Sequence, residues 1–524
     1  MQDYADTLDP EAAFHTARAR LEELIAAARE HGLQGTWSAD AAEQAVTGDG
    51  RAVELAVLQG FFDTRAAAEA AARAAGQLPC PRDAAGIEHR RVESGHVRHQ
   101  ATTVGCVTVR RLAFRARGAE NLYPGDAELN LPRGLHSHEI AKMAAIESAR
   151  GSFADATAAI TRRCGPVAAP AQVRALAISA AADFDAFYTA RVHTPGPDVD
   201  LLVLSADAKG IVMRPEDLRE GTRKAAQAAA ARGGALGDQH AGRKRMATLG
   251  TVYDAKPSPR RPHDVITITT ADKHKPGLRK KTRTDLEAAG KRPGPKAFNK
   301  WLTGSVADDA DQVIARMFAQ AIDRDPDHRR IWIVLVDGAV PQLEAIKTQA
   351  AACGVDIHIV IDFIHVLQYL HAAARAAHPG TPAAAEQALA AWALACLNGR
   401  STHVAAELAD LQDSPDTRPE EDRKPIRDAV TYLTNKAEHL RYDTALAKGW
   451  PIATGVIEGA CRHLIGDRLD ITGARWSLAG AEAVLKLRAL VANDDFDAYW
   501  AFHLKQEHRR NHQTRYQQDY LLTA

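Results

Sequence analysis

Apolar residues recur at helical spacing in the first part of the chain. Between residues 1 and 78 they fall among Ala, Glu and Arg, as in HTARARLEELIAAAREHG, and this pattern predicts a helical N-terminal region. Residues 79–135 differ, because polar and apolar side chains alternate in VTVRRLAF and Gly and Pro lie on either side. This alternation predicts a small β element.

Residues 136–195 contain two amphipathic segments, at about 153–163 and 170–184, on either side of the Gly165-Pro166 pair. A helix-turn-helix has this length and placement, so we expect a DNA-binding region here. Any hairpin of two helices has the same pattern, and that interpretation stays open.

Three runs of apolar β-forming residues lie in the centre of the chain: LLVLSADAKG (201–210), IWIVLVDGAV (331–340) and VDIHIVIDFIH (355–365). A fourth run, DVITITT (264–270), also predicts a strand. Continuous apolar runs are typical of strands buried on both faces of a mixed or parallel sheet. The fold class expected for residues 196–365 is therefore α/β.

Helical patterns occupy residues 366–449 and separate the last predicted strand from the segment PIATGVIEGACRHLIGDRLDITGARW (451–476). This order predicts a large all-helical insertion inside one domain. The second part of that domain is expected at residues 450–505, followed by a polar tail at 506–524.

Charge is balanced overall, with 66 Lys and Arg against 66 Asp and Glu, but it is unevenly distributed. Residues 1–80 contain thirteen acids and six bases, whereas residues 240–300 contain sixteen Lys and Arg and five acids. A basic loop of this kind predicts contact with nucleic acid. A solvated loop without a ligand has the same composition.

Other features indicate a cytoplasmic protein with no membrane partner. The longest apolar runs are shorter than the roughly 18 residues of a membrane span. The acidic start MQDYADTLDPEAAF is unlike a signal peptide. The six cysteines are scattered and suggest no disulfide framework, as expected for a reducing compartment.

Three carboxylates stand where an α/β sheet gathers its ligands. Asp207 and Asp337 come at the carboxyl ends of predicted strands, and Glu458 comes near the start of a predicted helix. Such carboxylates bind Mg²⁺ or Mn²⁺, and two ions together promote phosphoryl displacement. Taken singly, each aspartate is equally explained by a turn at the strand end, and the glutamate by the helix dipole.

Asp362 and His365 form a fourth element, D-x-x-H, where the third apolar run changes to helix. Asp362 is a candidate acid beside the metals, and His365 a candidate to orient a carboxylate or contact a phosphate. A helix N-cap followed by a surface histidine is the alternative explanation.

The order SADAKG, IVLVDGA, IDFIHVLQYL, helical insertion and GWPIATGVIEGACRHLIGDRLDITGARWSLAGAEAVLKLRAL resembles the ISKra-type DDE transposases of bacterial insertion sequences. These are similar to the Mutator-like group, which also has a C/D-x-x-H motif and a helical insertion before its glutamate. The resemblance covers roughly residues 200–505 and is most specific between residues 449 and 488.

The resemblance implies an RNase H-like catalytic core that holds two Mg²⁺ or Mn²⁺ ions. Asp207, Asp337 and Glu458 match the first, second and third catalytic acids, and Asp362 and His365 match the D-x-x-H pair. The implied activity is cleavage of double-stranded DNA at terminal inverted repeats, followed by joining of the 3′-hydroxyl to target DNA. Synapsis of two ends implies a homo-oligomer.

Two other functions fit the same motifs. An RNase H-like nuclease or resolvase would cut DNA without joining it. A DNA-binding relic or repressor would act through the N-terminal half and the basic loop alone.

One departure from the family concerns zinc. Family members often have a Cys-x-x-Cys element ahead of a β segment, but here Asp83 stands where the cysteine after Cys80 would fall, and Cys106 has no cysteine neighbour. Four-ligand zinc sites need paired spacings. We therefore expect no structural zinc and interpret residues 79–135 as a degenerate, zinc-ribbon-like element.

Basic residues near Glu458 and in the basic loop are candidate DNA contacts. Arg462 lies one turn after Glu458 on the same helical face, a position suited to a phosphate. Trp476 is a candidate to stack on an unpaired base, although such a ring more often packs in a core. The other candidates are Arg468, Arg475, Arg243, Lys244, Arg245, Arg260, Arg261, Arg279, Lys280 and Lys281.

Overall fold

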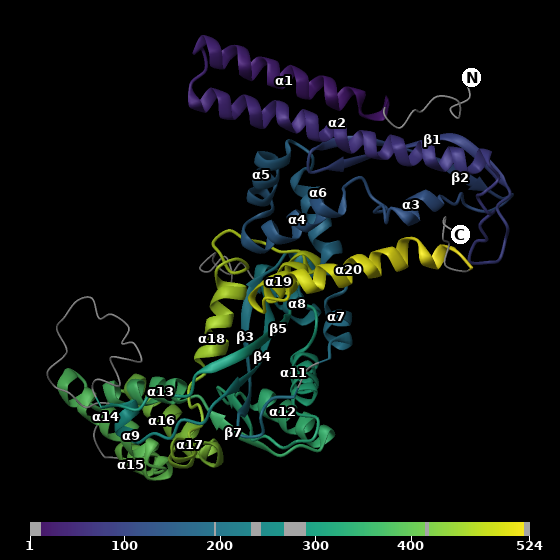
Figure 1. The fold of residues 1–524 in the computed structure, drawn as a ribbon. Coiled ribbons are helices and arrows are strands. Elements are labelled where there is room, and N and C mark those ends of the chain that lie inside the picture. The colour runs from purple at the N-terminus through teal and green to yellow at the C-terminus, as the bar shows by residue number, and fades with distance from the viewer. Residues whose placement is uncertain (1–11, 193–194, 232–242, 267–289, 414–418, 518–524) are drawn as a thin grey trace. The chain divides into compact units, whose positions relative to one another are not determined.

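The structure is a computed structural model that describes residues 12–192, 195–231, 243–266, 290–413 and 419–517. The chain divides into two units, residues 1–190 with 494–524 and residues 191–493 (Figure 1). The sequence-based division extended the catalytic core to residue 505. The structure instead assigns the chain from Asp494 onward to the first unit.

The first unit begins with two long helices that lie side by side, α1 (His15–Gln34) and α2 (Ala39–Ala74) (Figure 1). Gly35 ends α1 with a φ of 61°, a left-handed conformation that glycine adopts without a steric penalty. Ser38 begins α2 and accepts a hydrogen bond from the N–H of Ala41. The predicted helical N-terminal region is confirmed over these residues.

A β hairpin packs against α2 and confirms the predicted β element. Its strands β1 (Arg91–Thr102) and β2 (Gly105–Arg115) are antiparallel. The Gln59 amide on α2 donates to the carbonyl of Thr108 at 2.9 Å and accepts from its N–H at 2.8 Å. This paired contact satisfies backbone groups of β2 in the way that a neighbouring strand would.

The two segments predicted as a helix-turn-helix form α5 (Phe153–Cys164) and α6 (Pro170–Ala180), and a preceding helix, α4 (His138–Arg150), packs against both. Ile140, Ile160 and Val173 are fully buried between them. The remaining helices of this unit are α3 (Pro124–Glu128), α7 (Phe184–Ala190) and α20 (Phe496–Asn511).

The second unit is a mixed α/β domain built on a five-stranded sheet in the order β5-β4-β3-β6-β7. Strands β3, β4 and β5 are antiparallel neighbours, whereas β6 and β7 run parallel to β3. The strands are β3 (Leu201–Val212), β4 (Lys244–Ala255), β5 (Ala297–Ser305), β6 (Trp332–Val336) and β7 (Ile357–Ile361). The helices α8 (Glu220–Ala231), α11 (Ala310–Arg324) and α12 (Val340–Cys353) connect strands of the sheet.

The prediction that residues 240–300 form a basic loop was wrong over the residues that the structure describes there. All of β4 and part of β5 lie within residues 240–300, which were expected to form a loop. The chain is buried from residue 247 to 255. This strand was not predicted because Lys and Arg are frequent before and after it. Of the predicted strand 264–270, the structure describes residues 264–266, and the first two of these belong to a helical turn, α9 (Pro262–Val265), that begins with a proline. Residues 267–289 lie outside the described residues.

The helical insertion is confirmed in the part that the structure describes. Figure 1 shows its helices gathered in one group beside β7. They are α13 (Phe363–Ala377), α14 (Pro382–Leu397), α15 (Ser401–Asp413), α16 (Glu420–Asn435) and α17 (Tyr442–Lys448). The chain then forms α18 (Gly455–Ala460), a π-helical segment (Cys461–Gly466) and α19 (Leu478–Ala492). None of the described helices has the length and apolar character needed to cross a membrane.

A buried ion pair holds the N-terminal end of β3 against β4. Arg330, whose side chain is 1% exposed, donates to Asp254 at 2.8 Å and to the carbonyls of Asp200 and Leu201. We expect Arg330→Ala to lower the free energy of unfolding of this sheet by about 1–3 kcal/mol, because the buried Asp254 loses its nearest cation and keeps only Arg324 at 3.6 Å and the Asn299 amide. Hydrogen exchange of peptides from β3 and β4 measures this change.

The exposed Arg329→Ala is the matched control, and we expect a change within about 0.5 kcal/mol. Equal protection of β3 and β4 in both variants would contradict the role of the buried pair.

In the first unit, burial raises the pKa of Glu69 on α2 to about 7. A carboxyl group whose pKa is raised by folding contributes stability that is lost as pH rises from about 4.5 to 7. We therefore expect Glu69→Gln, which keeps an acceptor for the N–H of Leu112, to be more stable than the wild type at pH 8 by on the order of 2 kcal/mol. At pH 4 the difference should vanish.

Unfolding in urea at both pH values, followed by hydrogen exchange of α2 and β2, tests this expectation. Glu54→Gln, at an exposed position of the same helix, is the control and should show no such pH-dependent gain. A Glu69→Gln difference that is independent of pH would contradict the prediction.

Candidate catalytic site

Asp207 and Asp337 lie level with each other where the parallel ladder of β3 and β6 ends. The last pair of that ladder is Ser205 with Leu335, and each aspartate comes two residues later. Asp337 directly follows β6, as predicted. Asp207 lies inside β3, because β3 continues along β4 with Asp207 opposite Leu249. The prediction that Asp207 ends its strand was therefore wrong, although its alignment with Asp337 is unaffected.

Asp362 extends the same row to the next strand. The last β6–β7 pair is Val336 with Ile361, and Asp337 and Asp362 each come one residue later. The N–H of Asp362 donates to the carbonyl of Val336 at 2.8 Å. Three aspartates thus follow one another across β3, β6 and β7, and neighbouring strands lie about 4.8 Å apart.

The carboxylate of Asp362 is 2% exposed and caps α13 by accepting from the N–H of Ile364 at 3.1 Å. It also accepts from Thr454, from the N–H at 3.3 Å and from the hydroxyl at 2.9 Å. Asp362 is thus the N-cap of α13, as the alternative explanation proposed. Its hydrogen bonds with Thr454 are an additional contact that the sequence did not indicate.

Thr454 joins Asp362 to the third candidate acid. Its hydroxyl oxygen lies 3.1 Å from Oε1 of Glu458, an exposed residue of α18. A hydroxyl has one hydrogen to donate, so it serves one of these two carboxylates at a time. The backbone N–H of Thr454 remains with Asp362 in either case.

Cys461, three residues after Glu458, forms a hydrogen bond with Asp207. Its thiol donates to Oδ2 of Asp207 at 3.0 Å. Burial, together with the charges of Asp207 and Glu458, raises the pKa of this thiol well above its ordinary value, so it stays protonated and remains a donor. Glu458 therefore lies on a segment attached to Asp362 at Thr454 and to Asp207 at Cys461.

Tyr432 contacts Asp337, the middle residue of the row, and belongs to a small aromatic cluster. The hydroxyl of Tyr432 donates to the backbone carbonyl of Asp337 at 2.7 Å, and its ring stacks on Tyr369 with 4.1 Å between centroids. The contacts of His365 are with these two rings, at 6.3 Å and 6.0 Å. His365 thus lies near the acids through Tyr432, and its predicted contact with a carboxylate is absent from the described residues.

These carboxylates are of the type that binds a divalent metal ion, but they are not spaced closely enough to form a metal site. Mg²⁺ and Mn²⁺ prefer oxygen ligands of this type. Among the described residues, however, no group of three or more His, Cys, Asp or Glu side chains is close enough to hold a metal ion. Asp207, Asp337 and Asp362 form a row, and Glu458 lies on the segment between Thr454 and Cys461. The carboxylate of Asp207 accepts a hydrogen bond from the thiol of Cys461.

The residues that follow Glu458 divide into exposed and buried ones. Arg462 and Arg475 are exposed. Trp476 is 5% exposed, donates to the carbonyl of Leu469 at 2.9 Å and lies under the guanidinium of Arg468 at 4.6 Å. Its backbone pairs with the end of β3, which draws the ring into the core. Trp476 is therefore a core aromatic, the more ordinary of its two explanations, and its candidate role in stacking on a base was wrong.

In the basic segment, several predicted DNA contacts hold the fold instead. Arg245 donates to the carbonyls of Val306 and Ala307, and Arg260 donates to that of Trp450 at 2.7 Å. Burial lowers the pKa of both guanidinium groups. We conclude that these two arginines are structural.

The other basic candidates are placed differently. Arg243 is exposed, Lys244 pairs with Asp470 at 3.7 Å, and Arg261 pairs with Asp264 at 3.7 Å. Arg279, Lys280 and Lys281 lie outside the described residues.

The structure reveals an arginine-lined cavity in the first unit that sequence reasoning missed. Its volume is about 570 Å³. Asp126 pairs with both Arg98 and Arg111, so the two guanidinium groups share one carboxylate, and Arg111 also lies 3.8 Å from the ring centroid of Tyr123. The cavity is lined by the arginines at positions 98, 111, 133, 510 and 515.

These arginines come from the β hairpin, the loop between α3 and α4 and the C-terminal segment, so no single stretch of sequence indicates the cavity. The basic run in EHRRNHQTR was the one available signal, and it was interpreted as a polar tail. The carboxylate of Asp83, where a zinc ligand was missing, accepts from the N–H groups of Ala85 and Ile87 and pairs with His89 at 3.2 Å. Cys80 and Cys106 are exposed and free.

Comparison of the sequence with models of protein families and with curated proteins gives no match.

The shared contact of Thr454 gives a test of the site. We expect the nearly isosteric Thr454→Val to lower the free energy of unfolding by about 1–3 kcal/mol, because the buried carboxylate of Asp362 loses its hydroxyl donor. Thr454→Ser keeps that donor and should cost much less. Urea unfolding, with hydrogen exchange of α18, measures both. Equal stability of the two variants would show that the hydroxyl does not hold this segment.

Proposed function

We propose that this chain is a DNA transposase of the DDE type that its sequence resembles. The observation that carries the proposal is the row of Asp207, Asp337 and Asp362 across three strands, with the Glu458 segment attached at both ends of the row. Residues distant in the sequence are brought to one sheet edge in the order that the resemblance implies.

The sheet supports an RNase H-like core. Three antiparallel strands come first, two parallel strands follow, and their spatial order is third, second, first, fourth, fifth. RNase H-like domains have this strand order. In this proposal the helices from Phe363 to Lys448 are the insertion before the third acid.

The acids would hold the metals that such a reaction needs. Asp207, Asp337 and Glu458 are the candidate ligands for Mg²⁺ or Mn²⁺, which would activate water or a 3′-hydroxyl and stabilise the departing oxygen. Asp362 is better suited to positioning, because its carboxylate is buried and already accepts from Ile364 and Thr454. The segment that carries Glu458 is then placed by Asp362 and Thr454 together.

The DNA-binding part of the proposal rests on cations of the first unit. Among the five arginines of the first unit's cavity, the exposed Arg133 is the candidate for a backbone phosphate. The other four are already paired with carboxylates: Arg98 and Arg111 with Asp126, Arg510 with Asp183 and Arg515 with Glu120. Helix α6, which a helix-turn-helix would place in the major groove, has Arg174 as its one charged residue. Electrostatic contacts with DNA would therefore come from the cavity and from exposed residues such as Arg162 and Arg163 at the end of α5.

A second candidate, a DNA-binding protein without catalysis, is favoured by one observation. The hydrogen bond from Cys461 engages the carboxylate of Asp207 with a thiol. A catalytic role requires that this hydrogen bond yield when a metal binds.

The decisive variants are Asp207→Asn, Asp337→Asn and Glu458→Gln. On a plasmid that carries the gene with its flanking DNA, we expect strand cleavage in Mg²⁺ to fall at least about 100-fold in each, because a metal ligand is lost. EDTA should abolish wild-type cleavage. The matched control is Asp467→Asn, an exposed acid in the same region, which should cleave normally.

Three outcomes separate the candidates. Cleavage with joined products supports a transposase, whereas cleavage without joining indicates a nuclease or resolvase. DNA binding without cleavage in the wild type would reject both enzymes in favour of the DNA-binding protein. Gel analysis of both product types, beside a binding assay in EDTA, distinguishes them.

A further inference from the structure

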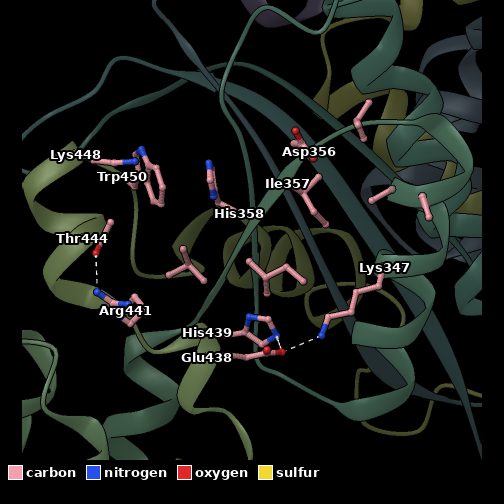
Figure 2. Close-up of a pocket in the computed structure, with 15 residues that line it drawn as sticks. Lys347, Asp356, Ile357, His358, Glu438, His439, Arg441, Thr444, Lys448 and Trp450 are labelled. Atoms are coloured by element: carbon pink, nitrogen blue, oxygen red, sulfur yellow. Dashed lines mark hydrogen bonds and ion pairs between the residues drawn. The ribbon is translucent and has the colours of Figure 1, made fainter.

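A second cavity lies at the edge strand of the sheet in residues 191–493 (Figure 2). Its volume is about 650 Å³, within the range of pockets that bind small organic ligands. The walls come from β7, from α12, from the turn Ala437–His439 and from α17. None of the candidate metal ligands lines it.

One side of this cavity is aromatic. The exposed ring of His358 stacks on the buried ring of Trp450, with 4.6 Å between centroids and 26° between planes. Figure 2 shows the two rings together with the ammonium group of Lys448, which lies 5.0 Å from the Trp450 centroid. Burial and Lys448 lower the pKa of His358, so this ring is largely uncharged at neutral pH.

Cations and a hydroxyl group follow one face of α17 along the same cavity. Arg441, Thr444 and Lys448 are spaced by three and four residues, and all three line the cavity. Arg441 is partly balanced by Asp443 at 3.3 Å, whereas the ammonium of Lys448 has the Trp450 ring as its contact.

The opposite side is internally balanced. Glu438 pairs with Lys347 at 2.9 Å and with His439 at 2.7 Å, as the lower part of Figure 2 shows. Asp356 is the other acid of the lining. Because the charges of Glu438 and Lys347 offset each other, the positive charge available to a ligand is concentrated at α17, next to the aromatic pair.

We propose that this cavity binds a nucleotide, with its base stacked on His358 and its phosphate against Lys448 and Arg441. A flat aromatic surface accepts any base, and adjacent cations accept the phosphate that a base carries. Trp450 supports the stacking ring from behind. The same chemistry is offered by an unpaired nucleotide of a DNA strand and by a free nucleoside monophosphate.

This proposal does not rest on the proposed transposase activity. His358 precedes Asp362 by four residues on β7, roughly 13 Å along the strand, so the cavity is separate from the row of acids. Binding can therefore be measured in EDTA, where no metal-dependent cleavage takes place. Failure of one proposal would leave the other standing.

The test uses the full chain and a single-stranded pentanucleotide that contains 2-aminopurine, whose fluorescence falls when the base stacks. We expect saturable quenching by the wild type. His358→Glu removes the ring and places a carboxylate near the phosphate, so affinity should fall about 10- to 100-fold. His358→Phe keeps a stacking ring and should bind like the wild type.

Lys448→Ala should weaken binding several-fold and make it less sensitive to salt, because one phosphate contact is lost. His403→Ala and Lys424→Ala, at exposed positions on α15 and α16, are the matched controls and should bind normally. Thermal unfolding of each variant verifies that it folds.

Competition with unlabelled ligands identifies the source. Displacement by deoxyadenosine monophosphate at concentrations similar to those of the pentanucleotide indicates a free nucleotide site. Displacement by the pentanucleotide alone indicates a site for a DNA strand. Quenching that is unchanged in His358→Glu, or absent in the wild type, overturns the proposal.

Discussion

The candidate site depends on the parallel register of three strands. Because β6 pairs with β3 on one side and β7 on the other, the residues that follow these ladders meet in one row. Asp207, Asp337 and Asp362 occupy that row. A slip of one residue in either ladder would turn the affected side chain to the other face of the sheet. The full burial of Val334 and Leu335 in the central strand opposes such a slip.

Glu458 reaches the row through hydrogen bonds rather than through the sheet. Helix α18 has six residues, too few to be stable by itself, and tertiary contacts therefore determine its position. Thr454 and Cys461, which precede and follow Glu458 by about one turn, supply these contacts. This attachment leaves Glu458 exposed while Thr454 and Cys461 are buried, which is compatible with the proposed role of Glu458 as a metal ligand.

Basic residues in this chain serve two purposes, and burial separates them. Arg330, Arg245 and Arg260 donate to backbone carbonyls or to a buried carboxylate and hold the sheet and its loops together. Others are exposed and line cavities: Arg133 in the first unit, and Arg441 and Lys448 beside β7 in the second. Composition alone does not distinguish a structural guanidinium group from one that is available to phosphate.

The sequence by itself determined most of the element types and the candidate acids. Periodicity identified the N-terminal helices, the β hairpin, three strands of the sheet and the helical insertion, because each element buries one repeating set of side chains. Tertiary structure decided where β3 ends, which side chains are buried and how the candidate acids are connected. Antiparallel pairing with β4 carries β3 past Asp207, burial makes Trp476 a core residue, and Thr454 joins Asp362 to Glu458. These outcomes depend on contacts between residues far apart in the chain, which spacing along one segment does not encode.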